Sequence, residues 1–97
     1  MRTYRLAFLR RAAKEWNGLD RSVRDQFERK LGERLVQPHV PHDRLRRYPA
    51  CYRIKIKRPG FRLIYRVEDD RLLVMVLKVA PRDTVYRDLG DRLGERG

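Results

Sequence analysis

The chain has 97 residues, enough for one small hydrophobic core, and a formal net charge of +12, which suits a polyanionic partner such as a nucleic acid. Its longest apolar run, Leu72–Leu77, is too short to span a membrane, its first residues lack the apolar core of a secretion signal, and its single cysteine excludes an internal disulfide. We therefore expect one domain, residues 1–97, that is soluble and cytoplasmic.

The first half of the chain predicts one strand and two helices. Alternation over Thr3–Ala7 indicates a short strand with one buried face. Apolar residues then fall at helical spacing from Leu9 to Trp16, and Asn17-Gly18 is suited to end that helix. Asp20 is placed to cap a second helix, whose apolar residues recur every four positions: Val23, Phe27, Leu31 and Leu35.

An irregular connection with two prolines follows at Gln37–His42. Its histidines, His39 and His42, are three residues apart, with no cysteine or supporting glutamate beside them. We interpret both as loop residues rather than metal ligands, and we expect neither a metal nor another cofactor.

The second half predicts three strands and a last helix. In Cys51–Lys57 apolar and basic residues alternate, and Phe61–Glu68 returns after a compact turn at Arg58–Gly60. Arg71–Val79 is apolar on both faces, which indicates a central strand covered on both sides. Thr84–Leu93 has the spacing of a short helix, although three glycines weaken its end.

The sequence pattern predicts that three residues of these strands are buried. Tyr52 and Tyr65 share the alternation of the apolar rows, so we expect them in the core rather than on an RNA-stacking surface. Cys51 has apolar neighbours in a strand, which favours a small buried hydrophobe over a nucleophile.

Positive charge concentrates between Arg44 and Arg66, a stretch with nine Lys or Arg residues and no acid. It holds no histidine pair and no carboxylate cluster, which disfavours a metal-dependent nuclease. If the chain cleaves RNA, we expect the 2′-hydroxyl of the RNA to be the nucleophile and the cations to stabilise charge on the phosphate. The charge pattern alone leaves simple RNA binding equally open.

Several motifs together resemble the RelE family of toxins, which act in RelB/RelE toxin–antitoxin systems. The likeness spans roughly Tyr4 to Leu89, and the segments that carry it are Ala13–Trp16, Leu45-Arg46, Pro49–Ile56, Gly60–Tyr65, Arg82 and Val85-Tyr86. The resemblance implies an α+β fold with two N-terminal helices on a small, twisted, mainly antiparallel sheet and a short C-terminal helix. It also implies ribosome-dependent cleavage of mRNA in the A site, which leaves a 2′,3′-cyclic phosphate and a 5′-hydroxyl, and a RelB-like antitoxin as partner.

The resemblance also implies the site residues. The catalytic candidates are Arg53, Lys55, Arg62, Arg82 and Tyr86, and Arg46 is an RNA-binding candidate. The basic stretch itself adds Lys57 and Arg58 as RNA-binding candidates. Arg62 is expected to hold the scissile phosphate, and Arg82 to lie near the leaving 5′-oxygen. Tyr86 is expected to orient the attacked nucleotide by stacking or hydrogen bonding.

The chain departs from the family pattern at Arg53, where RelE proteins typically carry a lysine that is a candidate general base. An arginine, with a reference pKa above about 12.5, is far harder to deprotonate than a lysine, at about 10.4. We therefore expect Lys55 to carry more of any base role and Arg53 to act as a phosphate clamp. The loop between Arg82 and Tyr86 is also shorter than expected for RelE.

Two other functions stay open at this point. ParE-like toxins share the element order but act on DNA gyrase and lack the basic catalytic row, and a non-catalytic protein would bind RNA and leave it intact.

Overall fold

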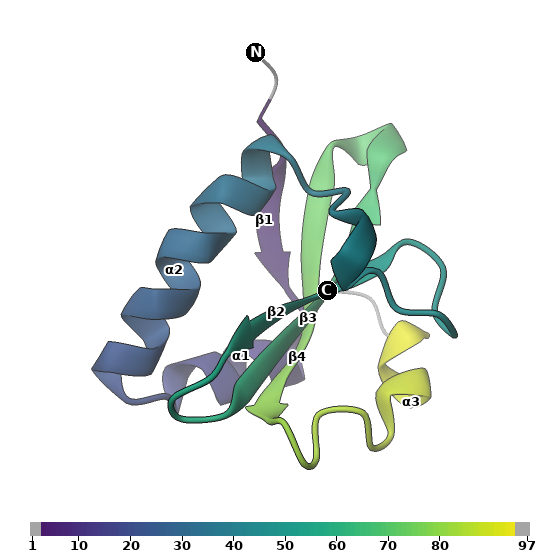
Figure 1. Ribbon diagram of the computed structural model, residues 1–97. Helices are drawn as coiled ribbons and strands as arrows, with labels where there is room; N and C mark the ends of the chain where they lie inside the picture. Colours follow the sequence, from purple (N-terminus) through teal and green to yellow (C-terminus); the bar gives the residue numbers. More distant parts are fainter. Residues whose placement is uncertain (1–2, 95–97) are drawn as a thin grey trace.

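In the computed structural model, which describes residues 3–94, the chain folds into a four-stranded sheet with helices on both faces (Figure 1). In chain order the elements are β1 (Arg5–Phe8), α1 (Arg10–Asn17), α2 (Arg21–Val36), η1 (Pro41–Asp43), β2 (Cys51–Ile56), β3 (Phe61–Glu68), η2 (Asp69–Arg71), β4 (Leu73–Pro81) and α3 (Leu89–Leu93). The strand order is β1-β4-β3-β2, with β1 parallel to β4 and the other two pairings antiparallel. This confirms the expected α+β fold and mainly antiparallel sheet.

The face of the sheet that α2 covers is apolar. Phe27 of α2 is fully buried, and its ring lies 6.3 Å from that of Trp16 on α1. Tyr52 and Tyr65, on adjacent strands, stack with ring centroids 5.6 Å apart, and both are buried. The prediction that these two tyrosines belong to the core is confirmed. The apolar residues that recur every four positions in α2 therefore form one stripe, which is buried against the sheet as their spacing indicates.

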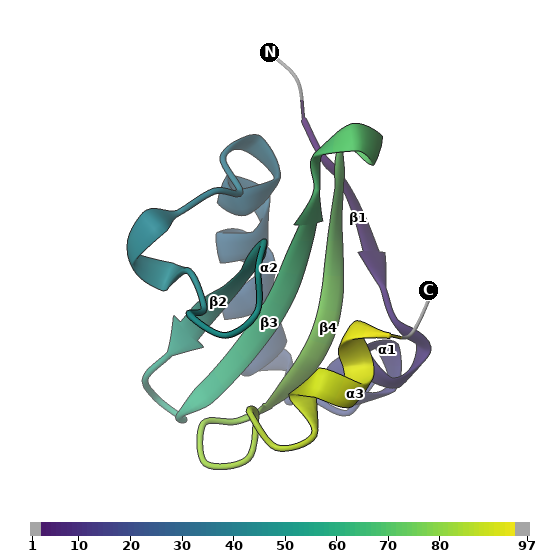
Figure 2. The ribbon, with the colours of Figure 1, turned by 90° about the vertical axis from the view of Figure 1, so that its right-hand side faces the viewer.

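The opposite face is covered by α3 and by the turn before it (Figure 2). Val85 and Leu89 from this segment are fully buried, and Arg66 of β3 donates a hydrogen bond to the carbonyl oxygen of Leu93 at 3.1 Å. The first seven residues of β4 are all buried, which confirms the predicted central strand covered on both sides.

β1 pairs with only the first part of β4, from Leu73 to Val76, and among residues 3–94 no strand lies beside the rest of β4 on that side. Side chains take the place of that strand. The Glu15 carboxylate accepts a hydrogen bond from the Val79 amide at 3.0 Å, and Arg92 donates to the Leu77 carbonyl at 2.8 Å. Arg92 and Glu15 also form an ion pair at 2.7 Å, which joins α3 to α1 across this edge.

The pKa of Glu15 reflects these contacts. Burial alone would raise it, but the hydrogen bonds from Arg92 and from the Val79 amide hold it below its ordinary value. The last helix is therefore tied firmly to α1 and β4, whereas its glycines predicted a weakly attached end.

Three local expectations are corrected. β1 begins two residues later than predicted, and Leu6 is 39% exposed because this short strand lies at the sheet edge. Asp20 occupies the position before α2, but its side chain makes no capping hydrogen bond. The predicted helix over 84–93 is helical only in α3; the preceding residues form turns, and Asp88 has φ 55, a left-handed conformation that interrupts a helix.

Cys51 is completely buried, as expected, and burial raises the pKa of its thiol to about 11. Within residues 3–94, no helix is long and apolar enough to cross a membrane.

Candidate nucleic-acid site

The register of the β2–β3 hairpin puts the predicted cations side by side. Lys55 lies directly across from Arg62, and Arg53 lies across from Ile64. Ile64 in turn pairs with Lys78 of β4. Because alternate residues of a strand share a face, Arg53, Lys55 and Arg62 lie on the face of the sheet that carries Lys78, below the turn after β4.

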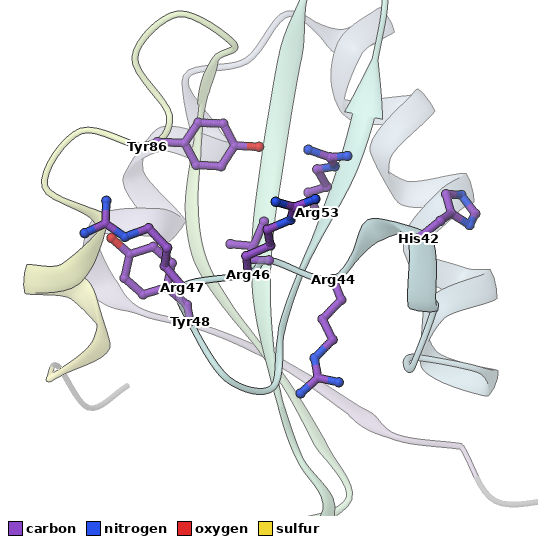
Figure 3. A pocket seen from close by; sticks show the side chains of 8 residues that line it. His42, Arg44, Arg46, Arg47, Tyr48, Arg53 and Tyr86 are labelled. Atoms are coloured by element: carbon purple, nitrogen blue, oxygen red, sulfur yellow. The ribbon is translucent and has the colours of Figure 1, made fainter.

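A hollow of about 470 Å³ opens beside this row (Figure 3). It is built from three segments: the end of η1 with the loop that follows, strand β2, and the turn after β4. The lining residues are His42, Arg44, Leu45, Arg46, Arg47, Tyr48, Arg53 and Tyr86. Four arginines and two tyrosines in one concave surface offer both phosphate contacts and ring faces for bases.

The loop between η1 and β2 is held by backbone bonds. The amide of Leu45 donates to the Cys51 carbonyl at 2.9 Å, and Leu45 itself is buried. The amide of Cys51 donates to the Tyr48 carbonyl at 3.2 Å. The loop is thereby anchored at an apolar residue while Arg46 and Arg47 are exposed toward the hollow.

Arg53 is the most constrained cation of the hollow. Its carbonyl oxygen accepts a hydrogen bond from Arg34 of α2 at 3.1 Å, and its Nε lies 3.6 Å from Oδ1 of Asp43. The Tyr86 hydroxyl points across the hollow toward the Arg53 guanidinium (Figure 3). The hydrogen bond with Tyr86 is the main reason that the pKa of Arg53 lies above its ordinary value; burial opposes this rise and Asp43 adds to it. Arg53 therefore stays charged.

Lys55 and Arg62 lie outside this hollow. Lys55 is exposed and borders a second hollow, between α2 and the outer edge of β2, together with Lys57. Arg62 is half-buried and donates to the carbonyl of Phe61 at 3.0 Å and more weakly to that of Ile56 at 3.4 Å. Both are available for an incoming anion.

Arg82, the first residue after β4, lies beside the turn of the β2–β3 hairpin. Its amide donates to the Gly60 carbonyl at 2.9 Å, and a Cβ at Gly60 would lie only 3.2 Å from the Arg82 side chain. Glycine at this position therefore permits the close approach. Arg82 itself is exposed, with its Nε 3.7 Å from Oδ1 of Asp83, and Arg58 in the β2–β3 turn is also exposed.

Tyr86 reaches the hollow from a turn without regular structure. The amides of Thr84 and Val85 both donate to the Pro81 carbonyl at 3.0 Å. From below, Lys78 donates to the carbonyl oxygens of Thr84 and Arg87, the second by a short hydrogen bond. Burial, with a contribution from Arg92, lowers the pKa of Lys78.

Known proteins share this sequence and architecture. The sequence pattern of the family described as "ParE toxin of type II toxin-antitoxin system, parDE" matches residues 6–86. The mRNA interferase toxin RelE of Escherichia coli (strain K12) is 42% identical over 92 residues, covering 93% of this chain and 97% of the relative. The chain belongs to the RelE/ParE family.

Two solved RelE structures are closely similar. A double mutant of E. coli toxin RelE in the free state superposes with a TM-score of 0.83 at 37% identity, covering 93% of each chain. RelE in the intact E. coli RelBE toxin–antitoxin complex gives 0.79 at 42% identity, covering 80% of this chain and 95% of that chain.

The candidates that the RelE resemblance supplied are thus partly brought together. Arg46, Arg53 and Tyr86 line one hollow, Lys55 and Arg62 face each other on the adjoining hairpin, and Arg82 lies at its tip. Lys57 and Arg58 lie beside or within the hairpin turn.

Sequence reasoning missed five lining residues: His42, Arg44, Leu45, Arg47 and Tyr48. Four of them belong to the basic stretch from Arg44, so its charge was the available signal. His39, by contrast, lies away from the hollow, 3.0 Å from Asp69 and against the ring of Tyr4.

Proposed function

We propose that this chain is the toxin of a type II toxin–antitoxin system and that it cleaves mRNA in the ribosomal A site. The observation that carries the proposal is the concave, cationic surface in which Arg46, Arg53 and Tyr86 meet beside the Lys55–Arg62 pair. The E. coli relative named mRNA interferase toxin RelE supports the same reaction.

In the proposed reaction the 2′-oxygen of one nucleotide attacks the neighbouring phosphorus, and the bond from phosphorus to the 5′-oxygen breaks. The products are a 2′,3′-cyclic phosphate and a 5′-hydroxyl, so a proton must leave the 2′-hydroxyl and another must reach the 5′-oxygen. Arg62 holds the phosphate oxygens as their charge grows. The raised pKa of Arg53 supports its assignment as a phosphate clamp, and Lys55 is the proposed base.

Arg82 and Tyr86 serve the other end of the reaction. Arg82, exposed beside the hairpin turn, lies near the leaving 5′-oxygen, either as the acid that protonates it or as an electrostatic stabiliser while solvent water supplies the proton. Tyr86 is 44% exposed and offers its ring to the attacked nucleotide while its hydroxyl contacts Arg53.

A RelB-like antitoxin is the proposed protein partner, in the cytoplasm where ribosomes work. The E. coli RelBE complex supports this pairing. An acidic or amphipathic antitoxin segment would complement a chain of net charge +12.

Primer extension on mRNA bound to programmed ribosomes tests the function. We expect codon-phased cuts that require the ribosome, and Arg62→Ala should slow them by roughly 100-fold or more, as for the loss of a transition-state donor. Arg29→Ala is the matched control, because Arg29 is exposed on α2 and its loss changes the net charge equally. Intact mRNA with the wild-type protein would exclude the proposal and leave RNA binding without cleavage.

The second candidate is a ParE-like action on DNA gyrase, which the description of the matching family favours. A supercoiling assay with purified gyrase separates the two. Inhibition of gyrase together with intact mRNA on the ribosome would replace mRNA cleavage as the function.

A further inference from the structure

A carboxylate lies buried directly behind the cationic hollow. Asp43, the last residue of η1, is only 5% exposed. Its Oδ2 accepts a hydrogen bond from Arg34 at 2.7 Å, and its Oδ1 faces Nε of Arg53 at 3.6 Å. Asp43 thus lies between an arginine of the α2 layer and an arginine of the site.

The contact with Arg53 is incomplete. Nε of Arg53 and Oδ1 of Asp43 are both buried, and within residues 3–94 neither has a hydrogen-bond partner. A buried donor and a buried acceptor left open are costly, and here they face each other at slightly more than hydrogen-bond distance. A small inward movement of the guanidinium would satisfy both atoms at once.

Arg34 makes the carboxylate a fixed point. Besides Asp43, its guanidinium donates to the Tyr65 hydroxyl at 2.9 Å and to the Arg53 carbonyl at 3.1 Å. The Tyr65 hydroxyl donates in turn to the Pro38 carbonyl at 2.7 Å. Arg34 therefore braces both the backbone of Arg53 and the carboxylate that faces its side chain.

We propose that Asp43 is a positioning residue that holds the Nε edge of Arg53 inward and so aims the other two nitrogens of the guanidinium at the RNA phosphate. A guanidinium has its donors in a rigid plane, so fixing one edge fixes the direction of the rest. A lysine has no such edge, which makes the Asp43 brace specific to an arginine at this site. This inference rests on the proposed function.

A double-mutant cycle tests the brace on programmed ribosomes. Asp43→Asn keeps the shape of the side chain and removes its charge, and we expect it to slow the single-turnover cleavage rate roughly 10- to 100-fold. In an Arg53→Ala background the same substitution should cost almost nothing, because the residue through which it acts is gone. An equal loss in both backgrounds would overturn the proposal and show a general structural role.

Asp43→Asn leaves Arg34 buried without its ionic partner, so the variant could fail to fold. In that case Arg34→Met combined with Asp43→Asn, which removes both charges together, is compared in the cycle with Arg34→Met alone, so that the contact of Arg34 with the Arg53 carbonyl is lost from both. Nitrogen-15 NMR of the arginine Nε–H groups is an independent readout: the Arg53 signal should shift in the Asp43 variant, whereas that of the exposed Arg29 should not.

The outcomes separate the two proposals. A wild-type protein that leaves mRNA intact contradicts the proposed function. An active wild-type protein whose Asp43→Asn variant cleaves equally fast, with an unchanged Arg53 signal, contradicts the brace alone.

Discussion

Two regions of the molecule supply the same hollow, and they are held in different ways. Arg53 comes from strand β2, whose neighbours are fixed by a regular register and by the Arg34–Asp43 pair. Tyr86 comes from a turn in which a buried valine and the hydrogen bonds from Lys78 take the place of a regular ladder.

The comparison shows how charge is used on the two sides. Behind β2 the charged groups brace a residue that already lies on a regular element. Behind the turn, Lys78 and the Arg92–Glu15 pair do the work that backbone pairing does elsewhere. We therefore expect the turn and α3 to respond more strongly than the hairpin to the loss of a single charged group.

The largest expected effect is the loss of stability when the Arg92–Glu15 ion pair is broken. Glu15→Gln leaves the guanidinium of Arg92 buried with a neutral partner, and we expect it to lower the free energy of unfolding by about 3 kcal/mol at pH 7. Urea unfolding followed by Trp16 fluorescence measures this, with Asp25→Asn, an exposed carboxylate of α2, as the control.

The same variant has a pH signature. The pKa of Glu15 in the folded protein is lower than its ordinary value, so its contribution to stability is present above about pH 4.5 and is lost as the pH falls through the folded pKa. The gap between wild type and Glu15→Gln should shrink toward pH 3. A gap of constant size would contradict an ionic role.

A smaller effect is expected for Lys78→Met, which removes the donor beneath the turn but keeps a side chain of similar length. The turn that positions Tyr86 over the hollow would then lose its support. We expect cleavage to slow about tenfold, which corresponds to a rise of about 1.4 kcal/mol in the activation free energy. Thr84→Ala is the control, because it keeps the carbonyl that Lys78 binds. Wild-type cleavage by Lys78→Met would show that the turn holds itself.

Binding of the proposed antitoxin should affect the two regions unequally. We expect amides of residues 84–93 to exchange hydrogen faster in the complex than in the free toxin, while those of β2 and β3 do not. Hydrogen exchange read by mass spectrometry tests this. Unchanged exchange over 84–93 would mean that the segment keeps its place.

The smallest effect is expected at Cys51, at the start of β2. With a thiol pKa of about 11 and no exposure, it should resist iodoacetamide at pH 8 until the protein unfolds. Alkylation of the native protein at the rate of a free thiol would show that the hairpin opens locally and that the two regions are alike.

The sequence predicts the hairpin almost to the residue. Alternation of apolar and basic side chains, interrupted in β3 by Ile64, with Gly60 at the turn, leaves one arrangement in which the apolar row is buried. The last helix is predicted too long, because Val85, Leu89 and Leu93 repeat every four residues. In the structure Lys78 donates hydrogen bonds to two carbonyl oxygens of this segment, and Asp88 adopts a positive φ. Neither feature can be seen in the spacing of the apolar residues.

The site divides in the same way. Arg46, Arg53 and Tyr86, which line the hollow, were predicted from charge and family resemblance, which mark residue types along the chain. Asp43 and Arg34 were not found, because their meeting depends on how η1 folds back between α2 and β2. A single acid next to a basic stretch carries no signal until that packing is known.

The edge of β4 beyond β1 gives the C-terminal segment a second importance. Glu15 and Arg92 occupy the backbone groups that a further strand would otherwise bind. A chain cut short before Arg92 would present an open strand edge, and such edges pair readily with one another. Truncated toxin should therefore accumulate as aggregates rather than as inactive monomers. The last helix thus helps to keep the protein soluble, because it covers this strand edge.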